Sequence, residues 1–169
     1  MHTLYLLRHA KSSWSDPTLP DQSRPLAARG RRDAKRIGKH LRELRVRPEL
    51  VLCSSARRTR ETLDLVRPAL AARTTVSLEQ DLYAASADEL LERLRTVPEQ
   101  VASVMLIGHN PGLQDLALTL AATGAELRRV EEKFPTAALA TLALPRTSWK
   151  QLSPADAELT DYVVPRQLD

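Results

Sequence analysis

Residues 4–10 of this chain have the sequence LYLLRHA, in which four apolar residues are followed abruptly by an arginine and a histidine. This pattern predicts a buried strand whose carboxyl end emerges at a surface. Ligands of open α/β sheets bind outside the carboxyl ends of the strands. Arg8 and His9 therefore stand where a phosphate-binding arginine and a nucleophile would act. The same two residues are also explained as the first polar residues after a strand.

The composition of the chain is that of a globular protein. Its 169 residues are 43% hydrophobic and 27% charged, which predicts a single domain over residues 1–169. Cys53 is the only cysteine, so no internal disulfide can form, and no Cys/His cluster has zinc spacing. The apolar run near the amino terminus is too short for a signal peptide or a membrane span. We expect a cytoplasmic protein with no membrane association.

The charge balance is basic, with 25 Lys and Arg against 21 Asp and Glu and a formal net charge of +4. The cations are spread over several segments, and aromatic residues make up only 4% of the chain. Few side chains are therefore available to stack on bases. We expect an anionic substrate rather than a nucleic acid, and salt-dependent oligonucleotide binding would reveal the latter.

Short apolar runs alternate along the chain with segments of helical periodicity. We predict strands at residues 4–7, 50–53, 76–78, 104–107 and 137–144. Helices are predicted at residues 26–44, at 59–70 with an open boundary near Pro68, from Ser86 through Leu94, and from Pro111 through Leu120. A short strand at 149–152 is a further prediction, and the tail ending at Pro165 is expected to pack on the body. The pattern is typical of an α/β three-layer sandwich whose mostly parallel central sheet is flanked by helices.

Two helix starts carry recognisable capping patterns. The segment from Ser86 to Glu89 has the sequence of a capping box. Asn110 and Pro111 suit the N-cap and the first helical position of the next helix. Both helices are therefore predicted to begin at these points.

Three of the predicted strands end in polar groups, namely Arg8-His9, Ser54-Ser55 and His109-Asn110. In a mostly parallel sheet these ends lie on one rim. The second of them leads into a helix start rich in arginine, where backbone N–H groups and the helix dipole favour an anion. The alternative for these arginines is a solvated first turn with pairs such as Arg57 with Glu61. Two histidines at strand ends favour a phosphate site with a nucleophile.

Several segments of this chain, in the order in which they occur, resemble segments of the histidine phosphatase superfamily, in the branch that includes phosphoglycerate mutases. Within that branch they resemble the SixA-like phosphohistidine phosphatases. The resemblance extends from residue 4 to about residue 144. The matching pieces are LYLLRHAKSSW, RPLAARG, SSARRTRET, LYAAS, VASVMLIGHNPGL and FPTAALATL. This resemblance implies the phosphoglycerate mutase-like fold and a phosphatase that works through a covalent phosphohistidine.

The resemblance also implies roles for individual residues. His9 would be the nucleophile, His109 a donor to the phosphoryl oxygens, and the phosphate would be held by Arg8, Arg24 and Arg58. Ser54 and Thr62 each lie four residues from Arg58, and this register selects it over Arg57 and Arg60. Nearby arginines disfavour the imidazolium and should lower the pKa of His9. Because guanidinium groups can neutralise the phosphoryl charge, we expect no metal and no cofactor.

The general acid of the mutase-like members has no clear counterpart here. Counting back from Tyr83 reaches Gln80, which has no acidic proton, although Glu79 and Asp81 flank it. Without an acid, alkyl phosphate esters should be poor substrates, because an alkoxide leaving group needs a proton. Phosphohistidine demands less, because its ring can be protonated before it leaves.

We therefore expect a phosphohistidine phosphatase that acts on a phosphorylated protein. A phosphatase of small phosphoesters, with Glu79 or Asp81 as its acid, and a non-catalytic phosphate-binding module remain the alternatives. Residues 11–23, with Trp14, either line the entrance or cap the sheet edge. Thr136 is expected to begin a strand rather than enter the site, and His2 and His40 to be surface residues. Neither the substrate nor the oligomeric state follows from the sequence.

Overall fold

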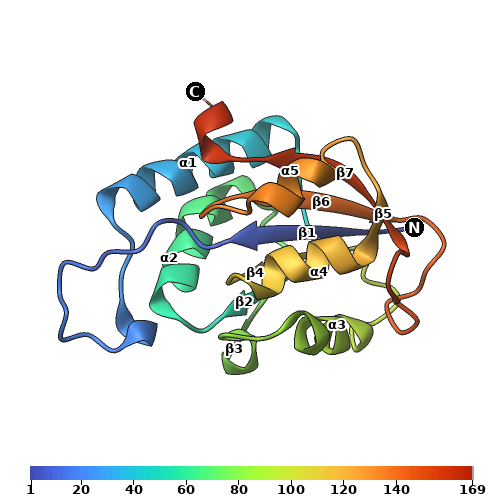
Figure 1. The fold of residues 1–169 in the computed structure, drawn as a ribbon, viewed down its shortest axis with the longest axis horizontal. Helices are drawn as coiled ribbons and strands as arrows, with labels where there is room; N and C mark the ends of the chain where they lie inside the picture. Colours follow the sequence, from blue (N-terminus) through green and yellow to red (C-terminus); the bar gives the residue numbers. More distant parts are fainter. Residues whose placement is uncertain (169) are drawn as a thin grey trace.

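The computed structural model describes residues 1–168, and its centre is a seven-stranded sheet in the order β3-β2-β4-β1-β6-β7-β5 (Figure 1). The first four strands are parallel to one another, β6 is antiparallel to β1 and β7, and β5 is parallel to β7. The predicted mostly parallel sheet is thus confirmed. The strands are β1 (His2–Arg8), β2 (Leu50–Ser54), β3 (Thr75–Glu79), β4 (Ser103–Gly108), β5 (Ala121–Thr123), β6 (Leu139–Leu144) and β7 (Ala157–Val163).

Helices cover both faces of this sheet, as Figure 1 shows. Along β1, Leu4 and Leu6 pack with α3, α4 and α5, whereas Leu7 packs with α1 and α2 on the other face. Side chains alternate between the two faces of a strand, so a strand buried on both faces is apolar throughout. The helices are α1 (Ala28–Glu43), α2 (Arg57–Val66), α3 (Ala87–Arg95), α4 (Gly112–Leu120) and α5 (Leu127–Glu132).

A topological switch point, at which the connections of neighbouring strands run to opposite faces of the sheet, lies between the neighbours β1 and β4. The chain leaves β1 through α1 on one face and leaves β4 through α4 on the other face. Crossovers between parallel strands are right-handed, so a reversal of direction along the sheet moves the helix to the opposite face. The crevice between two such connections is where open α/β sheets bind ligands.

Several local predictions hold. The capping box is formed: the Ser86 hydroxyl accepts from the N–H of Glu89, and the Glu89 carboxylate accepts from the N–H of Ser86. The strand predicted at residues 50–53 is present as β2, and Cys53 within it is fully buried. The Arg57 side chain donates to Glu61 at 3.1 Å, so the pair named as the alternative for the arginines of this first turn is present at Arg57.

Other local predictions are wrong. Residues 149–152 form no strand; the fully buried Trp149 instead donates its indole N–H to the carbonyl of Val101 at 2.7 Å. Pro111 is the N-cap of α4, so the predicted cap lies one residue early, although the Asn110 side chain still accepts from the N–H of Gln114. The side chain of His2 is only 13% exposed; its ring packs on Trp149 at 4.7 Å between centroids, and both ring nitrogens face backbone carbonyls.

Some element boundaries differ from the prediction, and some elements were not predicted. α2 ends at Val66 and is followed by a 3₁₀ turn, Arg67–Ala69, rather than continuing to residue 70. The tail does more than pack on the body, because β7 is an integral strand of the sheet. β5 and α5 were not predicted, and β6 begins at Leu139 rather than at residue 137.

Candidate active site

The three polar strand ends meet at one edge of the sheet, which we call the rim. His9 follows β1, Ser54 ends β2, and His109 follows β4. The two histidine rings lie 5.3 Å apart between centroids, and the Ser54 hydroxyl lies 2.7 Å from His109 Nε2. The prediction that these residues share one rim agrees with the geometry. Both imidazoles are almost fully buried.

The hydrogen bond made by His9 fixes its tautomer. Its Nδ1 lies 2.7 Å from the carbonyl oxygen of Ala10. A carbonyl can only accept, so Nδ1 carries the proton and Nε2 keeps its lone pair. The segment is anchored in turn by Thr62, whose hydroxyl accepts from the N–H of Ala10 at 3.0 Å and donates to the carbonyl of Arg58.

The surroundings of His9 keep it neutral. Burial is the main cause that lowers its pKa to about 3, and His109, Arg58 and Arg8 lower it further. The sequence analysis attributed the lowered pKa of His9 to nearby arginines, but desolvation lowers this pKa more than the arginines do. A buried charge is costly, so the imidazolium is disfavoured even before any neighbouring cation acts.

Arg8 and Arg58 each present an unsatisfied donor. Arg8 donates through Nη1 to the carbonyl of Phe134 at 2.9 Å, and Arg58 donates to the backbone oxygen and carboxylate of Asp21. The Nε–H of each is buried and has no partner within the described residues. An unpaired buried donor costs about 1–3 kcal/mol, which an acceptor such as a phosphoryl oxygen would recover.

Arg24 belongs to the same cluster. Its Nη1 donates to the Ser12 hydroxyl at 2.8 Å, its Nε donates to Asp21 at 3.1 Å, and its guanidinium stacks on Trp14 at 3.5 Å. The guanidinium is almost fully buried although Trp14 is 69% exposed. Residues 11–23 therefore contact the site, which favours the entrance reading of this loop over that of a cap on the sheet edge.

Asp21 and Tyr83 are site residues that sequence reasoning missed. The Asp21 carboxylate binds Arg24 and Arg58, and it accepts a 2.5 Å hydrogen bond from the Tyr83 hydroxyl. The Tyr83 bond is the largest cause that lowers the pKa of Asp21 to about 2, and the arginines add to it. An acid three residues before Arg24 was the only local signal, because the contacts to Arg58 and Tyr83 span 37 and 62 residues.

His109 lies between the arginine cluster and β2. Its Nδ1 faces Arg58 Nη2 at 3.5 Å, and the edge of its ring meets Tyr83 at 5.4 Å between centroids. Burial, followed by the charge of Arg58, lowers its pKa to about 4. This ring is therefore neutral at physiological pH and can hold one proton for donation.

The carboxylates considered as general acids lie away from this cluster. Glu79 accepts two hydrogen bonds from Arg93, at 2.7 and 2.8 Å, and a third from Ser77. Arg93 is the main cause that lowers the pKa of Glu79, so its carboxyl group is a poor proton donor. Glu79 and Asp81 line a separate cavity with Arg93, and Gln80 is exposed.

The remaining candidates take no direct part in the cluster. Thr136 precedes β6 by three residues and does not begin it. His40 is half-buried on α1, and its Nε2 has no partner within residues 1–168. In that same part of the chain, no group of His, Cys, Asp and Glu is arranged to hold a metal ion. None of its helices is long and apolar enough to cross a membrane.

Comparison with known proteins gives concordant matches. The model of the histidine phosphatase superfamily (branch 1) matches residues 4–102. An uncharacterized protein of Mycobacterium tuberculosis is 35% identical over 164 residues, which are 95% of this chain and 100% of that protein. The structure of a putative phosphohistidine phosphatase SixA from Nakamurella multipartitia superposes with a TM-score of 0.83 at 29% identity, over 97% of this chain and 96% of that one. The putative SixA of Agrobacterium tumefaciens gives 0.80 at 29% identity, over 97% and 98%.

Proposed function

Since this chain belongs to the histidine phosphatase superfamily and is a SixA-like phosphatase, we propose that it removes the phosphoryl group from phosphohistidine in a protein, with His9 as the nucleophile. The main support is the hydrogen bond from His9 Nδ1 to the Ala10 carbonyl, which leaves Nε2 unprotonated. A neutral ring with a free lone pair can attack phosphorus without first losing a proton.

In the first step, Nε2 of His9 attacks phosphorus in line and forms an N–P bond, while the N–P bond of the substrate breaks. The leaving imidazole departs neutral, because its other ring nitrogen takes up a proton from water before the bond breaks. Positive charge then develops on the His9 ring, where the Ala10 carbonyl accepts from Nδ1 and stabilises it. In the second step water attacks phosphorus, the His9 N–P bond breaks and inorganic phosphate leaves.

The arginines and His109 would supply charge stabilisation. In this proposal the unpartnered Nε–H groups of Arg8 and Arg58 would donate to the phosphoryl oxygens. In the structure Nδ1 of His109 accepts from Arg58 Nη2 at 3.5 Å, so the ring proton lies on Nε2 and faces the Ser54 hydroxyl. For His109 to donate to the same oxygens, the phosphoryl group would displace this Arg58 contact and the Ser54 hydroxyl would become the donor to Nε2. Arg24 would add a third cation, so this proposal needs no metal.

The state of Glu79 supports phosphohistidine over an alkyl phosphate ester. Arg93 and Ser77 hold its carboxylate in three hydrogen bonds, so it is not free to protonate an alkoxide. Phosphohistidine carries its own basic ring nitrogen, so this leaving group needs no acid from the protein.

The test gives the protein, in the presence of EDTA, a phosphohistidine peptide, an aryl phosphate, and sugar and nucleotide phosphates. We expect phosphate release from the peptide and the aryl phosphate, and an acid-labile, alkali-stable phosphoryl label on His9. Release from none of them, or undiminished release by His9→Ala, overturns the mechanism. Preference for the sugar or nucleotide phosphates overturns the substrate proposal, and loss of activity with EDTA overturns metal independence.

A further inference from the structure

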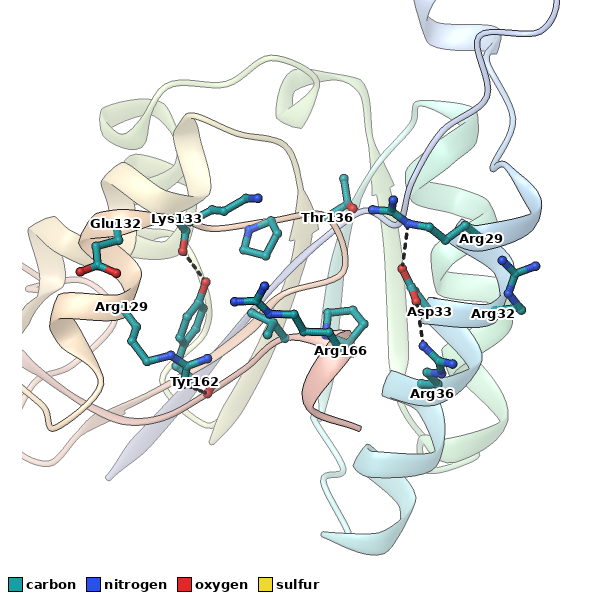
Figure 2. Close-up of a pocket in the computed structure, with 13 residues that line it drawn as sticks. Arg29, Arg32, Asp33, Arg36, Arg129, Glu132, Lys133, Thr136, Tyr162 and Arg166 are labelled. Atoms are coloured by element: carbon teal, nitrogen blue, oxygen red, sulfur yellow. Dashed lines mark hydrogen bonds and ion pairs between the residues drawn. The ribbon is translucent and has the colours of Figure 1, made fainter. Parts of the chain in front are cut away.

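A second concentration of charged side chains lies beside the rim, around a cavity of about 550 Å³ between α1 and the carboxyl-terminal part of the chain (Figure 2). Two carboxylates, Asp33 and Glu132, are among its lining residues. We call it the basic cavity. Its cations are Arg29, Arg32, Arg36, Arg129, Lys133 and Arg166.

The charge of this cavity is not balanced from within. Its six cations exceed its two lining carboxylates by four, and one of them, Arg129, is paired at 2.6 Å with Glu126, a carboxylate outside the lining, so three positive charges remain unmatched. Asp33 is shared between Arg29 and Arg36, at 3.7 and 3.5 Å. Lys133 has no carboxylate within 4.0 Å in the part of the chain that the structure describes. The excess charge predicts an anionic partner.

The basic cavity shares a wall with the rim. Lys133, Pro135 and Thr136 line the cavity. In the same segment, the Phe134 carbonyl accepts from Arg8, and the N–H of Ala137 lies within 3.1 Å of the carbonyls of both Arg8 and His9. One short stretch of backbone therefore touches the nucleophile segment on one side and the cavity on the other.

The cations come from three separate segments and surround the cavity. Figure 2 shows Arg29 reaching in from α1, Lys133 on the opposite wall, and Arg166 between the two walls. A single phosphate ion would contact only a few of them, whereas a run of several carboxylates can contact all of them. The side chains of Arg29 and Arg36 are 65% and 44% exposed, so a large partner can reach them.

We infer that the basic cavity binds an acidic segment of the phosphoprotein substrate while its phosphohistidine lies at the rim. This inference rests on the proposed function and adds to it a class of substrate, one with aspartates or glutamates near the phosphohistidine. A segment bound on the outer side of residues 133–137 places the neighbouring chain next to His9, because that stretch is the shared wall.

The cations of the basic cavity act on binding and not on the chemical step. Within residues 1–168 their ion pairs are with Asp33 and Glu126 and not with a rim side chain, so we expect them not to stabilise charge that develops at phosphorus. Exposed charges steer association and are screened by salt over about 8 Å at physiological ionic strength. Their removal should therefore raise KM, leave kcat unchanged, and matter less at high salt.

The experiment compares two phosphohistidine peptides that differ only in their flanks, one with three aspartates on each side and one with asparagines there. A triple variant, Arg29→Gln with Lys133→Gln and Arg166→Gln, is compared with a control triple, Lys35→Gln with Arg42→Gln and Lys150→Gln. The control cations are exposed and lie outside the cavity, and their substitution removes the same charge as the cavity triple. Phosphoramidate serves as a substrate without flanks.

At low salt we expect the wild type to have a KM about tenfold lower for the acidic peptide than for the neutral one, as three exposed pairs would give. The cavity variant should lose this preference with kcat unchanged, the control triple should keep it, and phosphoramidate should react equally with all three proteins. Equal KM values for both peptides in the wild type, or a preference that survives in the cavity variant, overturn the inference alone. Failure to hydrolyse either peptide overturns the proposed function instead.

Discussion

Arg58 and Arg29 lie in neighbouring helices, α2 and α1, and differ in almost every physical respect. The side chain of Arg58 is 8% exposed, bonded to Asp21 and fixed beside two histidines, whereas that of Arg29 is 65% exposed and has one long contact to Asp33. A buried charge cannot move or be replaced by water, so its removal changes everything that surrounds it. An exposed charge is screened and is useful only together with others. Single substitutions at the rim should therefore change the kinetics of phosphate release, whereas in the basic cavity several substitutions together should be needed to change them.

The largest effect is expected at the nucleophile. His9→Asn keeps a donor that can reach the Ala10 carbonyl but has no nitrogen that can carry the phosphoryl group. We expect phosphate release from a phosphohistidine peptide to fall at least about a thousandfold, as for other nucleophile deletions. Thermal unfolding measured in parallel should show a folded protein, and activity near that of the wild type would remove His9 from its proposed role.

Arg58 and its neighbour Arg57 give the sharpest test of the contrast between buried and exposed cations. Arg58→Ala should lower kcat about 10²–10³-fold, the usual cost of one lost donor to a transition-state oxyanion. Arg57→Ala removes only the exposed pair with Glu61 and should leave kcat within about twofold. Arg58→Lys should not restore activity, because an ammonium group lacks the planar fork. Equal losses at positions 57 and 58 would break the comparison.

The histidines of the rim should show their burial in a titration. Because burial lowers the pKa of His9 to about 3 and that of His109 to about 4, neither ring should titrate between pH 8 and 5 in proton NMR spectra, with His9→Asn used for assignment. A midpoint near 6.5 for either ring would contradict this. The triple variant of the basic cavity should leave both titrations unchanged.

The same shifts make folding depend on pH. Between about pH 6.5 and the lowered native pKa, the unfolded state binds a proton that the native state does not. The free energy of unfolding therefore falls as the pH falls through this window, by up to about 1.4 kcal/mol per pH unit for each histidine. Urea unfolding at pH 7 and at pH 4.5 should show a smaller loss for His9→Asn than for the wild type.

The smallest effect is expected for Glu79→Gln. Its carboxylate is held by Arg93 outside the rim, so phosphate release should stay within about twofold of the wild type, whereas loss of a working general acid costs about 10²–10⁴-fold. The measurement is kcat for the phosphohistidine peptide and for an alkyl phosphate. A large loss on the alkyl ester would make Glu79 an acid and favour the small-ester alternative.

The parts of the molecule that the sequence predicted are those with strong local signals. β1, β2 and β4 are buried on both faces, so each contains an unbroken apolar run, and polar residues follow that run within two positions. β7 was missed because Ala157–Val163 mixes buried and exposed residues and becomes a strand only by pairing with β6. A pattern that depends on a partner elsewhere in the chain cannot be recognised from its own residues.

The candidate site divides in the same way. His9 and His109 were proposed because each directly follows a buried strand, and Arg58 because the resemblance places it midway between Ser54 and Thr62. Asp21 lies in a loop, and its bonds to Arg58 and Tyr83 exist only after the chain has folded. The cavity cations also come from distant segments, so their sum was visible in the composition but their shared location was not.

The Asp21 carboxylate has a consequence for which anions can enter. In this structure the Asp21 carboxylate, which carries one negative charge, is ion-paired with both Arg24 and Arg58. An arriving anion gains only the difference between its own attraction to these guanidiniums and that of the resident carboxylate. A chloride or bicarbonate ion brings no more charge than Asp21 and gains little, whereas a doubly charged phosphoryl group gains more. In the proposed mechanism, Asp21 would therefore favour doubly charged anions over monoanions at His9.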